Sequence, residues 1–519
     1  MLNSVDFSGR PFHFIGIGGI GMSALAYVLA KRNIPVSGSD ISLSHITQRL
    51  QEEGAHIFWS QDATNLNFFC APESRVAEAL PSSTAAYSPS LKTLGETSRV
   101  RGQISEKDQA VCPTLPQVVC STAINPANPE YRAALDMGCP VFHRSDLLAA
   151  LIQDYQSVAI AGTHGKTTTS SMIGYLLLEA GLDPTIVVGG EVKAWDGNAR
   201  LGEGPYLVAE ADESDGSLVK LAAQIGVVTN IELDHPDHYT NLDEVIDTFK
   251  LFERNCKTLI GCIDCKTVRE DLNPTITYSL QPELEADYTA DNITYTATGT
   301  TAHIWERGQL LGQLHLKILG QHNLSNALAA IAVGRLLGLE FQVIAPILTN
   351  FEGARRRFER RGEPHHILFI DDYAHHPSEI QATLAAARLQ ASPSHGAPRR
   401  VIAIFQPHRY SRTQAFMDEF AQSFSNADLV VTTDIYSAGE PNLQGITGQS
   451  VADAIAQRHS QVSYQPTLAD VSAYLQDTLR PGDLVLFLGA GNLNRIIPDL
   501  VVFYQQLEQE HSGALPKQA

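Results

Sequence analysis

A glycine-rich turn between a short apolar run and an apolar helix constrains this chain more than any other stretch, and it occupies residues 157–172 (SVAIAGTHGKTTTSSM). The run at 157–161 predicts a buried strand, and the segment after the turn predicts a helix. Unpaired backbone N–H groups and the helix dipole converge at such a turn, which makes it an anion site. With two residues rather than four between its glycines, the loop is a shortened Walker A variant. We therefore predict an ATP site formed by Gly162, Thr163, His164, Gly165, Lys166, Thr167 and Thr168.

The length and composition describe an ordinary globular protein of several domains. A chain of 519 residues is too long for one hydrophobic core, and about three domains are expected. No apolar run reaches the ~18 residues of a membrane span, and the first residues do not resemble a secretory signal. Seven scattered cysteines indicate reduced thiols, so we expect a cytoplasmic protein. The pair Cys262 and Cys265 is interpreted as a coincidence rather than a metal or redox site.

The net charge of −20 limits the partners that this chain can bind. It argues against nucleic acid and anionic membranes. ATP is also an anion, so an acidic protein needs local basic clusters or metal ions to bind it, and their attraction acts within a screening length of ~8 Å. Arginines at 355–361 and 409–412 supply such clusters.

The N-terminal segment contains a second glycine turn. Residues 12–26 (FHFIGIGGIGMSALA) fit the pattern Gly-x-Gly-x-x-Gly between a strand and a helix, and an acidic residue follows about 20 residues later, after a second apolar strand. This pattern specifies a diphosphate more strongly than a nicotinamide, because UDP carries the same pyrophosphate and ribose hydroxyls as NAD. The predicted diphosphate site consists of Gly16, Gly18, Gly19, Gly21 and Asp40.

Residues 67–117 lose all apolar periodicity and are rich in Ser, Thr, Pro and Ala. A loop of this length inside a compact domain is usually an insertion or a disordered segment. We expect such a loop within a first domain of residues 1–152.

The predicted middle domain, residues 153–352, has carboxylates where its strands end. The apolar run at 206–209 is followed by Glu210, and the run at 225–231 is followed by an acidic stretch that contains His235. In a parallel sheet these ends lie at the edge that carries the ATP loop. Together with the Thr167 hydroxyl they suggest one or two Mg²⁺ ions. Asn323 and Asn326, in the first turn of a later helix, are either helix caps or nucleotide contacts.

The predicted third domain, residues 353–519, alternates strand and helix. Strands are expected at 367–370, 401–405, 429–433 and 484–488, which is typical of a doubly wound parallel sheet. Polar residues follow two of these strands, where such folds bind ligands. They are Asp372, Tyr373, His375 and His376 after the first, and His408, Arg409 and Arg412 after the second.

These motifs, in this order, resemble the Mur ligase family: HFIGIGGIGMSALA, AGTHGKTTT, AEADESD, NIELDH, GQHNLSNA, DDYAHHP and QPHRYSRT. The resemblance covers nearly the whole chain and implies an α/β protein of three domains. The first would be Rossmann-like and bind a UDP-sugar. The central one would be a P-loop ATPase-like parallel sheet that binds ATP. The third would be a Rossmann-like doubly wound sheet that binds an amino acid.

The resemblance also implies a reaction in peptidoglycan precursor synthesis. L-Alanine would be joined to the lactyl carboxylate of UDP-N-acetylmuramate through an acyl phosphate, with ADP and phosphate as products, in a cytoplasmic monomer or weak homodimer. The implied cofactors are ATP and two Mg²⁺ ions, with Thr167, Glu210 and His235 as the metal ligands. The implied catalytic residues are Lys166, Glu210, His235, Arg357 and Asp372. Asn323 and Asn326 would face the adenine, His408, Arg409 and Arg412 would bind the UDP-sugar with the glycine turn, and Tyr373, His375 and His376 would bind the amino acid.

Three alternatives remain open, the first within the resemblance and the other two from the residues. One is the murein tripeptide ligase of cell-wall recycling, with folylpolyglutamate synthase more distant. Another is an NAD-dependent oxidoreductase with an ATP regulatory module, although hydride transfer needs neither a second anion loop nor metal ligands. The last is a P-loop motor or switch, from which the short loop departs.

Overall fold

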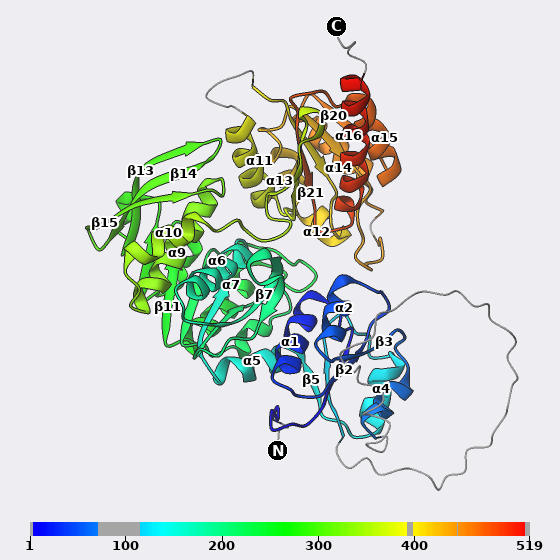
Figure 1. The fold of residues 1–519 in the computed structure, drawn as a ribbon. Helices are drawn as coiled ribbons and strands as arrows, with labels where there is room; N and C mark the ends of the chain where they lie inside the picture. The colour runs from blue at the N-terminus through cyan, green and yellow to red at the C-terminus, as the bar shows by residue number, and fades with distance from the viewer. Residues whose placement is uncertain (1–3, 71–114, 392–397, 444, 514–519) are drawn as a thin grey trace, which may run out of the picture. The chain divides into compact units, whose positions relative to one another are not determined.

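The computed structural model describes residues 4–70, 115–391, 398–443 and 445–513. These residues form two compact units, one of residues 1–151 with 199–201 and one of residues 152–198 with 202–519 (Figure 1). Most of the predicted loop at 67–117 lies outside the described residues, but residues 67–70 belong to a 3-10 helix and Gln117 begins a strand. No helix in the described ranges is both long and apolar enough to cross a membrane.

The first unit is built on a parallel sheet with the order β3-β2-β1-β4-β5. Each strand is followed by a helical segment, so neighbouring strands run in the same direction. This order reverses at β1, where the glycine turn lies, and confirms the Rossmann-like prediction. The elements are β1 (Phe12–Ile15), α1 (Ile20–Lys31), β2 (Val36–Ser39), α2 (His45–Glu52), β3 (His56–Phe58), η1 (Ala63–Cys70), β4 (Gln117–Cys120), α4 (Pro129–Asp136), β5 (Val141–His143) and α5 (Arg144–Gln153).

The middle of the chain forms a sheet with the order β15-β14-β13-β12-β11-β10-β6-β9-β7-β8. The strands from β12 to β7 in this order pair in parallel, as predicted, while β13, β14 and β15 form an antiparallel extension that the sequence did not indicate. The strands are β6 (Gln156–Ala161), β7 (Thr185–Val192), β8 (Gly197–Arg200), β9 (Tyr206–Glu210), β10 (Ile225–Val228), β11 (Thr258–Cys262), β12 (Ile276–Ser279), β13 (Tyr288–Thr296), β14 (Gly299–Glu306) and β15 (Gln309–Leu316). The helices are α6 (Lys166–Glu179), η2 (Lys193–Trp195), η3 (Ser217–Lys220), α7 (Leu242–Asn255), α8 (Lys266–Asp271), η4 (Pro282–Leu284), α9 (Gln321–Leu336) and α10 (Phe341–Thr349).

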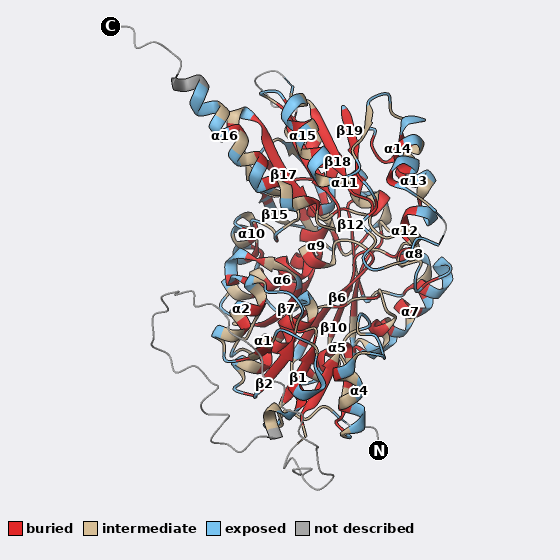
Figure 2. Ribbon diagram, turned by 90° about the vertical axis from the view of Figure 1, so that its right-hand side faces the viewer, coloured by how far each residue is buried: buried red, intermediate tan, exposed pale blue. Residues whose placement is uncertain are grey.

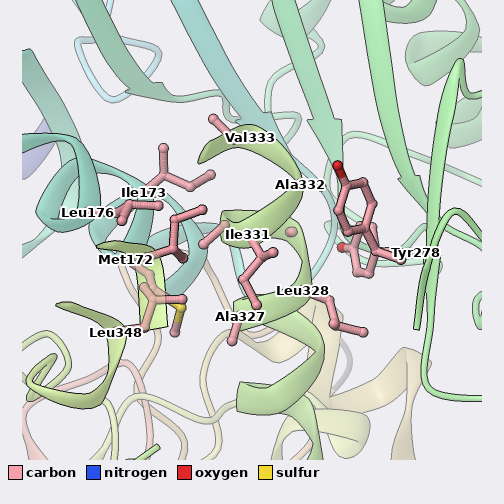
Figure 3. Packing of buried hydrophobic residues seen from close by; sticks show 14 of the residues in the cluster. Met172, Ile173, Leu176, Tyr278, Ala327, Leu328, Ile331, Ala332, Val333 and Leu348 are labelled. Atoms are coloured by element: carbon pink, nitrogen blue, oxygen red, sulfur yellow. The ribbon is translucent and has the colours of Figure 1, made fainter. Parts of the chain in front are cut away.

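Helices α6 and α9 are buried along most of their length. Met172, Ile173 and Leu176 of α6 belong to the same buried cluster as Leu328 and Ile331 of α9 (Figure 3). Full burial of each large aliphatic side chain contributes about 1.5–3 kcal/mol to folding. The packing therefore holds the N-termini of both helices in fixed positions at the sheet edge.

The last third of the chain forms a sheet with the order β16-β17-β21-β18-β19-β20, parallel except for β16. Figure 2 shows its buried strands in red and exposed residues on helices such as α15 and α16. The doubly wound prediction is confirmed, and two expected strands have the observed bounds. The strands are β16 (Glu359–Gly362), β17 (Leu368–Asp372), β18 (Val401–Phe405), β19 (Leu429–Thr432), β20 (Val462–Tyr464) and β21 (Leu484–Leu488). The helices are η5 (Pro364–His366), α11 (Pro377–Ala391), α12 (Tyr410–Ala415), α13 (Met417–Gln422), α14 (Gly448–Ala456), α15 (Leu468–Thr478), η6 (Leu493–Ile496) and α16 (Ile497–Gly513).

Candidate functional site

The predicted ATP loop connects β6 to α6, and both of its glycines have backbone angles that favour glycine. Gly162 has φ of +138° and Gly165 has φ of +80°. A Cβ atom on Gly162 would lie 1.9 Å from Oγ1 of Thr229, and one on Gly165 would lie 3.0 Å from Oδ1 of Asn326. The loop therefore requires glycine at both positions, for conformation and for space.

The residues that follow β10 hold this loop in place. Asn230 Oδ1 accepts a hydrogen bond of 2.8 Å from the backbone N–H of His164, and Thr229 Oγ1 donates one of 2.6 Å to the carbonyl of the same residue. Oγ1 of Thr163 accepts a bond of 2.8 Å from the backbone N–H of Glu232. Thr229 and Asn230 could not be predicted from the sequence, because only the pairing of β10 with β6 brings them to the loop.

Lys166 turns back onto its own loop. Its Nζ donates to the carbonyls of Gly162 at 2.6 Å and Thr163 at 3.1 Å, and it lies 2.9 Å from the Glu213 carboxylate. Burial opposes the charged amine, but the carboxylates around it, Glu213 foremost, outweigh burial and raise the pKa of Lys166. Burial also raises the pKa of Glu213 to about 7, against the effect of the lysine. The loop thus contains a fixed ammonium group, and the pKa of its buried counter-ion, Glu213, lies close to neutral pH.

Thr167 and Glu210 form a set of oxygen atoms beside the loop that suits Mg²⁺. Oγ1 of Thr167 donates to Oε1 of Glu210 at 3.1 Å, and Oε2 of Glu210 accepts from the backbone N–H of Gly189 at 2.7 Å. A hydroxyl and a carboxylate are the ligands that a hard cation prefers, so these residues fit the ion. Arg357 reaches the same place, because its Nη2 lies 3.3 Å from Oγ1 of Thr167.

His235, the other predicted metal ligand, lies in a strained backbone position with φ of +54°. Its ring is 3.6 Å from the Asp234 carboxylate and 3.5 Å from Nη2 of Arg412. Burial lowers the pKa of His235, so the ring is neutral near pH 7, as metal ligation requires. Strain of this kind is common at functional sites. The ring is thus in the neutral form that can bind a metal ion, and the role of His235 as a ligand stays a prediction.

A cavity of about 250 Å³ opens between the ATP loop, the start of α9 and the start of α11. Its lining includes seven residues that the sequence predicted separately, drawn from three parts of the chain. These are His164, Gly165, Thr168, Asn323, Asn326, Arg357 and Asp372.

The amides and the carboxylate in this cavity are oriented by their neighbours. Asn323 Nδ2 donates to the carbonyl of Leu319 at 2.7 Å, and Asn326 Nδ2 donates to Oδ1 of Asn323 at 3.3 Å. The Asp372 carboxylate accepts the backbone N–H of Phe358 at 2.7 Å, which holds the segment next to Arg357. Burial raises the pKa of Asp372 to about 6. The cavity walls are therefore preorganised by hydrogen bonds.

His164, inside the ATP loop, lies between two carboxylates. Its Nε2 is 3.4 Å from Oε2 of Glu232, and its Nδ1 is 3.3 Å from Oε1 of Glu379. Burial opposes protonation of the ring, but the two carboxylates outweigh burial and raise the pKa of His164 to about 10. The ATP loop therefore carries a second cation in addition to its lysine.

This arrangement predicts a pH dependence of stability. A group whose pKa rises on folding stabilises the folded state fully below its unfolded pKa, about 6.5 for histidine, and loses that contribution as pH rises through its folded pKa. The free energy of unfolding should therefore fall between pH 6.5 and about 10, and this slope should be reduced in His164→Asn. Denaturant unfolding of both proteins at several pH values measures it. Identical pH dependence of the free energy of unfolding in the two proteins would contradict the raised pKa of His164.

Glu379 also organises the predicted amino-acid-binding segment. Its Oε2 accepts the backbone N–H groups of His375 at 3.0 Å and His376 at 3.2 Å. The ring of Tyr373 lies against the guanidinium of Arg357, whose Cζ is 5.0 Å from the ring centroid. Burial lowers the pKa of His375 to about 4 and also lowers that of His376, so both rings are neutral. Glu379 and Glu232 were not predicted as site residues: nothing in the sequence distinguishes Glu379 from other glutamates, and Glu232 lies in the acidic stretch after the run at 225–231, of which only His235 was predicted as a ligand.

The predicted basic residues before and within α12 pair with acidic side chains. Arg412 is buried, and its Nε and Nη2 donate to the Asp234 carboxylate at 2.7 and 3.2 Å. Arg409 Nη1 contacts Asp237 at 2.9 Å and Glu440 at 3.0 Å. Burial lowers the pKa of His408 to about 3. These residues are held in defined positions beside the metal-ligand candidate His235, because Asp234 precedes it directly.

The predicted diphosphate site lies in the unit that contains residues 1–151. Gly16 has φ of +79°, and Gly19 is the N-cap of α1, so Gly21 lies inside the helix rather than in the turn. The backbone N–H of Gly18 donates to Oδ2 of Asp40 at 2.8 Å. Asp40 therefore supports the turn, in addition to the predicted contact with ribose.

Three family models match consecutive parts of the chain. "Mur ligase family, catalytic domain" matches residues 11–156, "Mur ligase middle domain" matches residues 160–334, and "Mur ligase, glutamate ligase domain" matches residues 356–491.

Curated relatives and solved structures match over nearly the same length. A UDP-N-acetylmuramate–L-alanine ligase from Nostoc punctiforme is 65% identical over 97% of this chain and 98% of its own. A protein of the same name from Gloeothece citriformis is 61% identical over 96% and 99%. The structure of a UDP-N-acetylmuramate-alanine ligase from Thermotoga maritima covers 97% of this chain and 99% of its own, with a TM-score of 0.72 and 25% identity. A murein peptide ligase from Psychrobacter arcticus shares the fold, with a TM-score of 0.65 and 22% identity over 96% and 99%.

Proposed function

The chain belongs to the Mur ligase family, and from this premise we propose that it joins L-alanine to the lactyl carboxylate of UDP-N-acetylmuramate at the expense of ATP. One observation carries the proposal: relatives of that name are 65% identical over nearly the whole chain. The murein tripeptide ligase alternative is supported by likeness of fold alone. The reaction belongs to peptidoglycan precursor synthesis, and its nucleotide substrates assign it to the cytoplasm.

The chemistry requires that the carboxylate be activated first. A carboxylate is a poor electrophile and its oxide is a poor leaving group, so its oxygen attacks the γ-phosphate of ATP and forms an acyl phosphate with release of ADP. The amine of L-alanine then attacks the acyl carbon, and phosphate leaves from the tetrahedral intermediate. Lys166 and the loop amides hold the β- and γ-phosphates, where they stabilise charge that shifts during transfer.

Mg²⁺ fits the oxygen atoms of Thr167 and Glu210, and Glu210 and His235 would hold a second ion. Bound there, the metal neutralises charge on the phosphate oxygens. Arg357 extends the same cationic surface, since its guanidinium contacts Thr167. Asn323 and Asn326 bind the adenine side of ATP, and Asp372 fixes the segment that carries the arginine.

The remaining predicted residues bind the other two substrates. Gly16, Gly18, Gly19, Gly21 and Asp40 hold the UDP-sugar diphosphate and ribose, and His408, Arg409 and Arg412 bind substrate anions, the two arginines through their charge and the neutral histidine through hydrogen bonding. Tyr373, His375 and His376 bind L-alanine.

Phosphate release with UDP-N-acetylmuramate, ATP and one amine substrate at a time tests the function. We expect turnover with L-alanine and none with the tripeptide L-alanyl-γ-D-glutamyl-meso-diaminopimelate. Turnover with the tripeptide alone would assign the chain to murein recycling. An equilibrium titration without ATP should show binding of the UDP-sugar and none of NAD, and the reverse result would support the oxidoreductase alternative.

Glu210→Gln should raise the Mg²⁺ concentration needed for half-maximal activity by about tenfold, because an amide lacks the charge that a hard cation prefers. A Mg²⁺ titration of phosphate release measures this. Glu203→Gln is the matched control, since Glu203 is an exposed carboxylate shortly before the same strand. An unchanged titration in Glu210→Gln would show that Glu210 is not a ligand.

A further inference from the structure

A carboxylate buried in the first unit has no part in the function described so far. Glu130, in the first turn of α4, is 0% exposed, and so is its partner His13 in β1. Burial of an ionisable group costs free energy unless several hydrogen bonds compensate for it. Such a group therefore calls for an explanation beyond simple packing.

Four segments of the first unit meet at this carboxylate. Oε1 of Glu130 is 2.7 Å from Nε2 of His13 and accepts from Nδ2 of Asn65 at 2.9 Å. Oε2 accepts from Oγ of Ser39 at 2.5 Å. The far nitrogen of His13, Nδ1, pairs with Oγ of Ser37 at 2.7 Å. One side chain of α4 thereby joins β1, β2 and η1.

The same strand end supports the glycine turn. The carbonyl of Ser39 accepts the backbone N–H groups of Gly16 at 2.8 Å and Ile17 at 2.9 Å. The next residue, Asp40, accepts the N–H of Gly18. Three successive N–H groups of the turn are thus bonded to residues 39 and 40, and the side chain of Ser39 is bonded to Glu130.

We propose that Glu130 is a positioning residue for the UDP-sugar site, which it shapes through Ser39 and Asp40 without touching the substrate. The inference rests on the proposed function, because it takes the glycine turn as the diphosphate site. An amide at this position would replace one carboxylate oxygen with a donor, so the bond that Ser39 Oγ donates to Oε2 would be lost or have to reverse its direction. The turn would then lose the fixed shape that an anion needs.

Equilibrium titration with UDP-N-acetylmuramate, without ATP, tests this in the full chain. Glu130→Gln should bind about tenfold more weakly than the wild type, since the buried bond from Ser39 Oγ is lost or reversed. Asp136→Asn is the matched control, an exposed carboxylate at the end of the same helix, and it should bind as the wild type does. Unchanged binding in a folded Glu130→Gln variant would overturn the inference, whereas a wild type that does not bind the UDP-sugar would overturn the proposed function instead.

Steady-state kinetics separates positioning from general destabilisation. Positioning raises KM for the UDP-sugar about tenfold and leaves KM for ATP and kcat within about twofold, whereas partial unfolding lowers the active fraction and moves no KM. Equal rises in both KM values would therefore contradict the inference. If Glu130→Gln does not fold, Ser39→Ala removes only one bond of the network and should weaken UDP-sugar binding in the same direction. Unchanged binding in that variant would also overturn the inference.

Discussion

Lys166→Ala is expected to reduce the rate of phosphate release about 10³-fold or more, because the lysine meets charge that shifts during phosphoryl transfer. Its Nζ lies within the loop that is the proposed phosphate site, 2.6 Å from the carbonyl of Gly162. The fold should survive, since the pKa of Glu213 is already raised to about 7 by burial and this side chain can take up a proton when its partner is removed.

A phosphate-release assay together with circular dichroism measures both parts of this prediction. Lys266→Ala, which removes an exposed lysine from α8, is the control and should behave as the wild type does. Activity of a folded Lys166→Ala variant within tenfold of wild type would refute the ATP-loop assignment.

Gly162→Ala should weaken ATP binding by about 100-fold. The added Cβ would lie 1.9 Å from Oγ1 of Thr229 and 3.1 Å from its backbone nitrogen, in a backbone conformation with φ of +138°. The loop must shift to relieve this overlap, and the strain of such a position is about 1–3 kcal/mol before the overlap is counted. ATP titration by calorimetry measures the loss.

Gly181→Ala separates strain from overlap, because Gly181 has φ of +78° but no neighbouring atom within 4 Å of the added Cβ. It should lower stability slightly and leave ATP binding unchanged. Adding Thr229→Ala to Gly162→Ala removes the nearest colliding atom and should restore part of the affinity. Wild-type ATP affinity in Gly162→Ala would show that the loop geometry does not matter for binding.

Much of the site could be predicted because its residues follow strands of parallel sheets. Glu210 and the ATP loop come directly after apolar runs that the structure confirms as β9 and β6, and parallel strands end at one edge. Asp372 could be placed by the same reasoning at the end of β17. The strands expected at 401–405 and 484–488 have those bounds because both are continuous apolar runs with a buried side on each face.

The missed residues have roles that depend on tertiary neighbours. Glu379 lies in an ordinary helix, α11, and becomes part of the site only because His164 packs against it. Glu232 begins an acidic stretch in which the sequence favours His235 as the ligand, and its proximity to the ATP loop follows from the order of strands in the sheet. The antiparallel strands β13, β14 and β15 alternate polar and apolar residues, unlike the continuous apolar runs that predict the parallel part of the sheet.

The pairing of β6 with β10 determines where this protein tolerates a change of length. Ala161 lies opposite Val228, so the ATP loop and the residues that hold it leave the sheet at the same level although they are about 65 positions apart in the sequence. Extra residues between α6 and β10 can be accommodated in the loops there, because they leave this alignment intact. A single residue inserted within β10 would instead shift Thr229 and Asn230 by one step and turn each to the opposite face of the strand. Natural length variation in this half of the chain should therefore be confined to the connections, while β10 keeps a constant spacing to the residues that follow it.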